Sequence, residues 1–309
     1  MAQGFRSRLR AWWHGLDMEV APEPQVERPV PPAPAAERTP DGAAWSPMRI
    51  KAAELVIGDD CRTPIGPDKA VEALKPLGLT NAKAVLEVGA GLGNAARHIA
   101  AVYGAWVSGY ESSASLAEQA MARSVAAGMA KKAPIIHVDL EALKQPETTF
   151  DCVYGREPFF TVKNKSALFE TLVGAMKAGG ELVFTDYMLR APDVGSATVR
   201  EWTAGEPVEP HPWTLEQLVA LLRKLRLDVR VSQDYSKQFR DLAVRRLEAL
   251  VTKNETLSAD PSQTELLLRE VEMWGRRVNV LDSGDVQVHR IYARKSGGAD
   301  GKIRGMSNW

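Results

Sequence analysis

The chain has 309 residues, of which 45% are hydrophobic, so it can bury a sizeable core and is not wholly disordered. Lysine plus arginine and aspartate plus glutamate each number 39, so the formal net charge is zero and no overall field draws the chain to nucleic acid. Its two cysteines, Cys61 and Cys152, are too few for a disulfide framework or a zinc site. This usage predicts a reduced, cytoplasmic protein without a metal, and no apolar run approaches the roughly 18 residues of a membrane span.

The first 44 residues differ in composition from the rest. Apolar residues recur there at helical spacing among arginines: Phe5, Leu9, Trp12 and Leu16. This pattern predicts a basic amphipathic helix over residues 1–20. Eight of the 19 prolines fall in residues 22–47, which predicts a disordered linker over residues 21–44. A tethered basic helix is typical of contact with a membrane surface or a protein partner, here through residues 1–18. A helix that packs on its own domain and a targeting segment are the alternatives.

Short apolar segments alternate with helical patterns in the globular part of the chain. Seven such segments are found, at residues 84–88, 105–111, 134–139, 150–155, 181–187, 227–233 and 286–295. The alternation predicts an α/β domain over residues 45–295, with a doubly wound parallel sheet and helices on both faces. Two further helical patterns, at residues 236–253 and 263–280, predict helices between the sixth and seventh strands. The Gly-rich residues 296–309 are expected to form a disordered tail.

A glycine-rich turn follows the first predicted strand. Gly89, Gly91 and Gly93 stand between this strand and a helical pattern, where glycines let a ligand approach the backbone. A dinucleotide fingerprint requires G-x-G-x-x-G. Here the third glycine comes one residue early and Asn94 fills the expected place, so nicotinamide binding is disfavoured.

Acidic residues stand at the ends of the first three strands. Glu111 ends the second strand, where its carboxylate can accept hydrogen bonds from ribose hydroxyls. Asp139 ends the third strand, where it and the backbone N–H of Leu140 can bind the edge of adenine. Glu87 precedes the glycines, close enough to bind the ammonium group of an amino acid. Each acid alone is equally consistent with a solvated strand end, but together they describe a pocket for adenosine with an amino-acid tail. That ligand is S-adenosylmethionine.

These residues resemble the seven-stranded S-adenosylmethionine-dependent methyltransferases, whose last strand lies antiparallel beside the fifth. Residues 57–79, 150–187 and 213–239 resemble, more narrowly, the phosphoethanolamine N-methyltransferases and related small-amine enzymes. The resemblance covers about residues 45–295. The residues predicted to bind the cofactor are Glu87, Gly89, Gly91, Gly93, Glu111, Ser112, Asp139, Leu140 and Arg156.

The resemblance also implies an acceptor site. In that family a tyrosine and a histidine manage the amine proton, but Trp45 and Thr161 stand at their positions and neither is a base at neutral pH. The family's Arg-Asp pair corresponds to Arg156 and Glu157. Its phosphate contacts correspond to Tyr187, His211, Trp213 and Arg277. We therefore expect catalytic roles for Glu157 and Tyr187, and acceptor contacts from Trp45, His211, Trp213 and Arg277.

The leading hypothesis is methyl transfer from S-adenosylmethionine to a small or amphiphilic acceptor, above all an amine. A carbon acceptor or a lipid-like acceptor stays open. The alternative is a methyltransferase-like domain retained for binding, docked to a membrane or a larger assembly through its N-terminal helix. The loss of both dyad residues motivates this alternative. A nucleic-acid substrate is not favoured, because no basic stripe is present and the fourth strand lacks a D/N-P-P-Y/F sequence.

We predict that deleting residues 1–42 leaves the melting temperature within a few degrees of that of the intact chain, while localisation or partner binding is lost. The reason is compositional, because this segment offers one short apolar face and then prolines that bury almost nothing. Thermal unfolding of the intact and shortened proteins measures the effect. A larger fall in melting temperature would show that the helix packs on its own domain.

Overall fold

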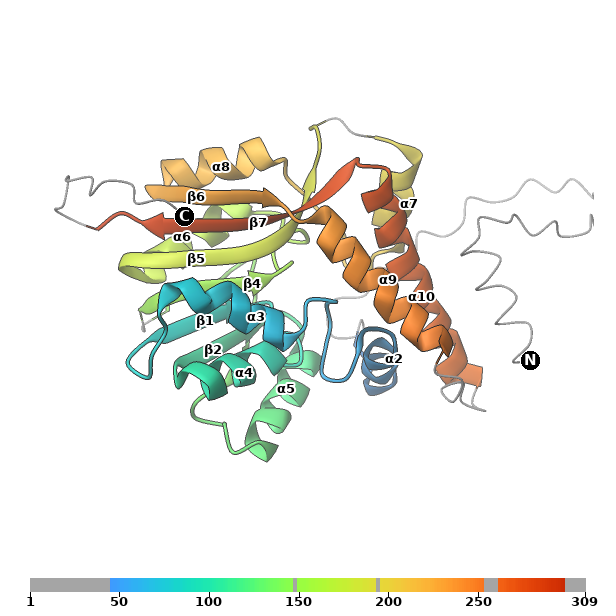
Figure 1. Ribbon diagram of the computed structural model, residues 1–309, viewed down its shortest axis with the longest axis horizontal. Helices are drawn as coiled ribbons and strands as arrows, with labels where there is room; N and C mark the ends of the chain where they lie inside the picture. The colour runs from blue at the N-terminus through green and yellow to red at the C-terminus, as the bar shows by residue number, and fades with distance from the viewer. Residues whose placement is uncertain (1–44, 147–148, 193–194, 253–260, 298–309) are drawn as a thin grey trace, which may run out of the picture.

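A single seven-stranded sheet forms the centre of the computed structural model (Figure 1). The structure describes residues 45–146, 149–192, 195–252 and 261–297. The predicted N-terminal helix, the linker and residues 298–309 of the predicted tail lie outside these residues. The strands are β1 (Ala84–Val88), β2 (Trp106–Glu111), β3 (Ile135–His137), β4 (Phe150–Arg156), β5 (Met176–Leu189), β6 (Leu227–Asp234) and β7 (Val286–Lys295).

The strand order is β3-β2-β1-β4-β5-β7-β6, with β7 antiparallel between β5 and β6. Strands β1 to β5 pair in parallel. This order confirms the predicted doubly wound sheet and the antiparallel seventh strand. β3 is shorter than the predicted residues 134–139 because it lies at the edge of the sheet, where Ile136 and His137 are exposed and only one neighbour offers hydrogen bonds.

Helices cover both faces of the sheet and one of its ends. They are α2 (Pro47–Ile57), α3 (Pro67–Leu74), the 3-10 turn η1 (Lys75–Leu77), α4 (Asn94–Tyr103), α5 (Ala114–Ala126), α6 (Lys165–Ala175), α7 (Ala197–Gly205), α8 (Leu215–Lys224), α9 (Ser236–Thr252) and α10 (Pro261–Asp282). The last two confirm the helices predicted between the sixth and seventh strands. Side chains that accept a hydrogen bond from the third helical N–H begin α2, α5, α6, α7 and α8: Ser46, Ser113, Asn164, Ser196 and Thr214.

The core is divided by the sheet. On one face, α3, α4 and α5 pack on β1, β2 and β4 through small residues such as Ala96 and Ala120. On the other face, α6 and α8 pack on β1, β4 and β5 through larger residues such as Phe169 and Leu222. Because both faces are covered, the central strands are continuous apolar runs rather than alternating ones, as Val85 and Leu86 of β1 illustrate.

A third apolar cluster joins α2, α7, α9 and α10 at one end of the sheet, and these four helices are called the helical cap (Figure 1). Trp202 of α7, Phe239 of α9 and Trp274 of α10 are fully buried in it. α10 is the central member, because it packs on α2, α7 and α9. Phe160, which follows β4, and Tyr187, near the end of β5, belong to the same cluster, so the helical cap covers the end of the sheet at which these parallel strands finish.

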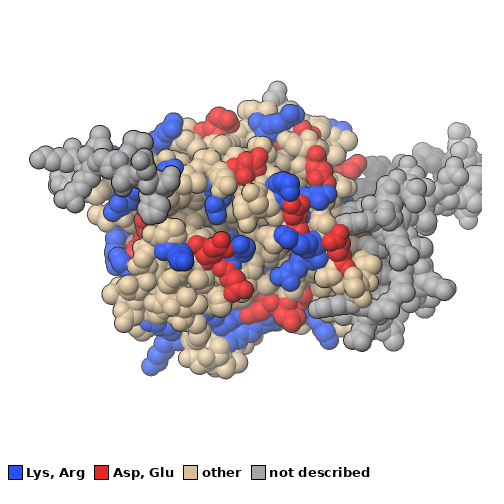
Figure 2. Space-filling view, viewed as in Figure 1, with Lys and Arg blue, Asp and Glu red and all other residues tan. Residues whose placement is uncertain are grey.

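Charges on the surface are mixed. Figure 2 shows lysine and arginine side chains interspersed with aspartate and glutamate on the face in view, without a large area of one sign. This arrangement agrees with the zero net charge of the sequence. It gives that face no basic stripe for a nucleic acid.

Asp151 links three strands through one carboxylate. Its oxygens accept hydrogen bonds from Lys83 Nζ (2.9 Å), the backbone N–H of Ala84 (3.0 Å) and Lys177 Nζ (2.7 Å). Burial by itself raises the pKa of this carboxyl, but the hydrogen bonds outweigh burial and lower its pKa to about 2. A carboxyl whose pKa falls on folding contributes stability above its unfolded pKa of about 4 and loses that contribution as the pH falls toward 2.

We predict that Asp151→Asn lowers the free energy of unfolding by about 1 kcal/mol at pH 7, a value reduced because both lysines are partly exposed. The loss should shrink as the pH is lowered from about 4 toward 2, where the wild-type carboxyl also becomes neutral. Urea unfolding at several pH values measures this. Asp228→Asn, which breaks an exposed pair with Arg230, is the control and should change stability by less than about 0.5 kcal/mol. Equal effects of the two substitutions would contradict the assignment.

Candidate active site

A cavity of about 120 Å³ lies between the carboxyl ends of the parallel strands and the helical cap. The sheet contributes residues 89–92 and 94 after β1, 111–113 at the end of β2, Leu140 after β3, and 156–158, 160 and 161 at the end of β4. The helical side contributes Trp45, Arg62, Thr63, residues 206–208 and Arg277. In an open α/β sheet this edge is where ligands bind, so the cavity is the candidate site.

The glycine turn forms one wall of the cavity. Gly91 has φ +58°, in the left-handed region, and a side chain added there would place its Cβ 3.2 Å from Arg62 Cγ. Gly89 also lines the cavity, whereas Gly93 precedes α4 and packs against Arg97. Two of the three predicted glycines therefore face the cavity directly.

The carboxylate of Glu111 fixes the glycine turn through a hydrogen bond to its backbone. One carboxylate oxygen accepts from the backbone N–H of Gly91 at 2.7 Å, and the other accepts from the N–H of Ser113 at 2.9 Å. The side chain is buried but lines the cavity, as does Ser112. A carboxylate has about four lone-pair sites, so Glu111 keeps acceptor capacity for hydroxyl groups of a ligand.

The structure places Glu87 and Asp139 outside the wall of the cavity. Glu87 is fully buried beneath the cavity wall, where it pairs with Arg156 at 3.1 Å and burial raises its pKa. Asp139 is exposed and accepts a hydrogen bond from the N–H of Glu141 at 2.9 Å. Neither lines the cavity, although Leu140, the neighbour of Asp139, does.

Glu157 is the carboxylate on the β4 side of the cavity. Its oxygens accept hydrogen bonds from Thr185 Oγ1 at 2.6 Å and Thr63 Oγ1 at 2.5 Å, and its N–H donates to the carbonyl of Thr185 at 2.7 Å. These contacts hold it at φ +50°, a conformation that is strained for a residue with a side chain. Burial raises the pKa of Glu157 against the opposing effect of the two hydroxyl groups.

Trp45 lines the cavity, but cations of the chain itself lie over its ring. The guanidinium carbon of Arg62 lies 3.7 Å from the ring centroid and that of Arg49 lies 4.4 Å from it. Arg62 is partly exposed, but its Nε is buried and has no hydrogen-bond partner, and burial of the guanidinium lowers the pKa of Arg62 to about 10. No sequence pattern singles out Arg62 or Thr63, although both fall in residues 57–79, where the family resemblance is found.

Three predicted acceptor residues lie outside the cavity wall. Tyr187 is 1% exposed and packs in the apolar cluster of the helical cap, with its ring 4.9 Å from that of Phe160. The backbone N–H of His211 donates to the carbonyl of Phe160, and its carbonyl accepts from Lys165 Nζ. Trp213 packs beside α8, on the face of the sheet that α6 and α8 cover. Of the predicted acceptor residues and Tyr187, the cavity therefore gathers only Trp45 and Arg277, together with Arg156 and Glu157.

Arg277 lines the cavity with an ionic partner already in place. Its Nε and Nη2 donate to the two carboxylate oxygens of Glu206, each at 2.7 Å. Glu206 lies 71 residues earlier in the chain, just after α7. No local pattern distinguishes it from the other acidic residues, so sequence reasoning missed it.

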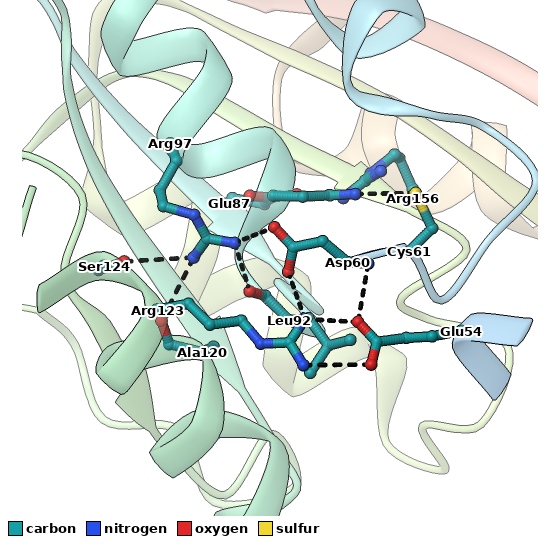
Figure 3. A network of polar contacts seen from close by, with 11 residues as sticks. Glu54, Asp60, Cys61, Glu87, Leu92, Arg97, Ala120, Arg123, Ser124 and Arg156 are labelled. Carbon is teal, nitrogen blue, oxygen red and sulfur yellow. Dashed lines mark hydrogen bonds and ion pairs between the residues drawn. The ribbon is translucent and has the colours of Figure 1, made fainter. Parts of the chain in front are cut away.

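A network of charged side chains holds residues 58–66, called the 58–66 loop, against the sheet (Figure 3). Asp60 lies between two arginines: Arg97 of α4 donates to one of its oxygens, and Arg123 of α5 donates to the other at 2.8 Å. Arg123 also donates to Glu54 of α2 at 2.6 Å. The loop that carries Arg62 and Thr63 is therefore fixed from α2, α4 and α5.

Arg156 fastens the same loop from beneath. It donates to the carbonyl of Ile65 at 2.8 Å, to Asn94 Oδ1 at 2.9 Å and to Glu87. Asn94 in turn donates to Cys61 Sγ at 3.0 Å. Arg156 thus joins β1, β4, α4 and the 58–66 loop at the floor of the cavity.

Residues 85–180, from β1 into β5, match the family of methyltransferase domains. This part of the chain is therefore similar to a methyltransferase domain. Phosphoethanolamine N-methyltransferase 1 of Arabidopsis thaliana is 23% identical to it over 225 residues, which are 73% of this chain and 45% of that protein. The Plasmodium falciparum phosphoethanolamine N-methyltransferase is 28% identical over 142 residues, or 45% of this chain and 52% of that protein. The chain thus spans about half the length of the curated relatives that it matches.

A solved structure shares the fold of this chain. Phosphoethanolamine N-methyltransferase 2 of Haemonchus contortus, in complex with phosphomonomethylethanolamine and S-adenosylhomocysteine, aligns with a TM-score of 0.71. The two are 22% identical, and the alignment covers 80% of this chain and 57% of that one. The predicted fold and the predicted relationship to the methyltransferase superfamily are confirmed.

Two features are absent from the described residues. No helix there is long and apolar enough to cross a membrane. No group of three or more histidine, cysteine, aspartate or glutamate residues there is arranged to hold a metal ion.

Proposed function

We propose that the protein transfers a methyl group from S-adenosylmethionine to a small acceptor, above all an amine. The observation that carries this proposal is the cavity itself, which brings the glycine turn, Glu111 and Glu157 together at the carboxyl edge of the sheet. The phosphoethanolamine N-methyltransferase relatives support an amine as the acceptor. The cofactor, when bound, supplies an electrophilic methyl group.

The residues at the β1 and β2 end of the cavity fit the cofactor. Glu111 offers carboxylate lone pairs to ribose hydroxyls, and Leu140 offers an apolar side chain and a backbone N–H to adenine. The buried Nε of Arg62, which has no partner, suits the carboxylate of an amino-acid tail. The cavity of about 120 Å³ is small for such a ligand, so we expect the Arg62 side chain, which lies against both Gly91 and Trp45, to rotate as the ligand enters.

Glu157 is the group that we place beside the acceptor. Its two threonine partners fix the carboxylate, and its raised pKa makes it a stronger base than an ordinary glutamate. An ammonium group held there gives up its proton to Glu157, and the amine lone pair is then free to react. Orienting the amine and excluding water are the remaining tasks of the cavity wall. This role replaces the tyrosine and histidine dyad, whose positions hold Trp45 and Thr161.

A second candidate is a methyltransferase-like domain retained for binding. The specific observation in its favour is that Trp45 is covered by guanidinium groups of the chain itself, so the dyad position offers neither a base nor an open aromatic face. Under this alternative, the basic segment of residues 1–18 would dock the domain to a membrane or to a protein partner. A lipid-like acceptor is the related enzymatic possibility.

We predict that Gly91→Val and Glu111→Ala each weaken binding of S-adenosylmethionine and S-adenosylhomocysteine by at least tenfold. Valine at Gly91 is strained at φ +58° and its side chain enters the cavity wall, while Glu111→Ala removes charge-assisted hydrogen bonds usually worth about 1.5 to 3 kcal/mol. Calorimetric titration measures both dissociation constants.

Gly78→Val is the matched control. Gly78 also has φ +58° and has no atom of another residue near its side-chain position, so its substitution carries the backbone strain without touching the cavity. Its cofactor affinity should equal that of the wild type. Wild-type protein that binds neither cofactor form below about 1 mM, which corresponds to only about 4 kcal/mol, would contradict the enzymatic proposal.

We predict that Glu157→Gln lowers kcat/KM for a cationic amine by about tenfold or more, which equals about 1.4 kcal/mol, with cofactor affinity unchanged. In the wild type, activity should fall as the pH is lowered through the pKa of Glu157, because the base becomes protonated; the glutamine variant should lack this fall. Transfer of labelled methyl across a pH series measures both. Glu118→Gln, which removes an exposed carboxylate from α5, is the control. Full activity of Glu157→Gln would show that Glu157 is structural only.

A further inference from the structure

The ion pair of Arg277 and Glu206 is built into the cavity wall. The side chain of Arg277 is 10% exposed and that of Glu206 is 1% exposed. Both oxygens of Glu206 meet the guanidinium group in the two-fold geometry that is strongest for arginine and carboxylate. Trp202 Nε1 also donates to Glu206 at 2.8 Å. The carboxylate is therefore held by three hydrogen bonds.

Aromatic rings hold the cation of the same pair. The guanidinium carbon of Arg277 lies 4.5 Å from the ring centroid of Trp274 and 5.9 Å from that of Phe160. Despite its burial, the nearby carboxylate of Glu206 keeps the pKa of Arg277 well above its ordinary value. The positive charge of Arg277 and the negative charge of Glu206 therefore cancel, so the pair is neutral as a unit. α7 and α10 fix it in place.

An anion that entered the cavity would have to compete with Glu206 for Arg277. Displacing Glu206 would leave a buried carboxylate without its cation, which is more costly than an ordinary anion contact can offset. The other two arginines that line the cavity do not offer an entering anion a free cation beside Glu157. Arg156 is paired with Glu87 beneath the wall, and Arg62 lies against Gly91, on the cofactor side.

We propose that Glu206 makes this cavity selective for acceptors without a phosphate or carboxylate group, that is, for uncharged or cationic amines. The proposal rests on the proposed methyl transfer and narrows its substrate class. Because Glu206 neutralises Arg277, the carboxylate of Glu157 is left to meet the charge of an acceptor, which suits an ammonium group. Pro207 and Val208, which follow Glu206, add an apolar surface for the uncharged part of the acceptor.

The family resemblance implies a phosphate contact at the position of Arg277. This chain keeps the arginine, but Glu206 occupies it, and this pairing is the difference from the family pattern. The Haemonchus contortus structure holds a phosphorylated amine. The arginine is present here, but its hydrogen-bonding edge is turned to a carboxylate of the same chain. Removing that carboxylate is therefore expected to uncover an anion site.

Calorimetry with the full chain saturated with S-adenosylhomocysteine tests the proposal, using phosphoethanolamine and ethanolamine as matched probes. We expect the wild type to bind phosphoethanolamine at least tenfold more weakly than ethanolamine, and Glu206→Gln to bind phosphoethanolamine at least tenfold more tightly than the wild type does. The double variant Glu206→Gln with Arg277→Met should lose that gain. Glu265→Gln, which removes the exposed partner of Arg269 on the same helix α10, is the control and should gain nothing.

Two outcomes would overturn the proposal. The first is wild-type protein that binds phosphoethanolamine as tightly as ethanolamine or more tightly, a measurement that needs no variant to fold. The second is a Glu206→Gln variant that keeps its melting temperature and its affinity for S-adenosylhomocysteine but gains no affinity for phosphoethanolamine. A wild-type protein that does not bind S-adenosylhomocysteine would instead refute the proposed methyl transfer. Failure of the selectivity proposal and failure of the proposed function are therefore distinguishable.

Discussion

Charge compensation at the carboxyl edge of the sheet determines the shape of the site. Carboxylates and guanidinium groups are buried there together, and a buried charge is tolerated only when an opposite charge or several hydrogen bonds meet it. The pairs of Glu87 with Arg156 and of Glu206 with Arg277 satisfy this requirement across different elements of the fold. The first pair joins β1 to β4, and the second joins the segment after α7 to α10. The same ion pairs therefore balance the buried charges and hold the cavity wall in place.

Two charged groups in the cavity wall keep room for a ligand group of opposite charge. Glu157 is held by hydroxyl groups rather than by a cation within ion-pair distance, and Arg62 has a buried Nε without a partner. An amino-acid carboxylate would complete Arg62, and an ammonium group would complete Glu157. The ligand chemistry that we propose is therefore the chemistry that the wall itself leaves unsatisfied.

The sheet could be predicted well from the sequence because its strands and turns are marked by residues that are close together in the chain. Apolar runs such as that of β1, the glycine turn and the acid at the end of β2 occupy the positions that a parallel sheet gives them, and the cavity gathers Gly91 and Glu111 as expected. Asp139 was placed on the cavity by its strand end alone, but a short edge strand leaves it in solvent. Its neighbour Leu140 lines the cavity, and the contact of Asp139 with adenine stays a prediction.

The acceptor end was harder to predict because its partners are distant in the chain. Glu206 and Arg277 are separated by 71 residues, and no periodicity or spacing joins them. The same is true of Thr63 and Glu157, which are 94 residues apart. Tyr187 was assigned to the acceptor from the family resemblance, yet the packing of Trp202 and Phe239 encloses its ring in the helical cap. Residue identity was preserved at that position, but its surroundings could be known only from the fold.

We propose that one cavity holds the adenosyl cofactor against Glu111 and presents its sulfur to Glu157. A crystal structure of the full chain with S-adenosylhomocysteine tests this most directly. We predict that the ribose hydroxyls lie within hydrogen-bond distance of the Glu111 carboxylate, that the sulfur faces Glu157, and that Arg62 has moved from Gly91 toward the amino-acid carboxylate. A ligand bound elsewhere, or one whose sulfur faces away from Glu157, would contradict the account.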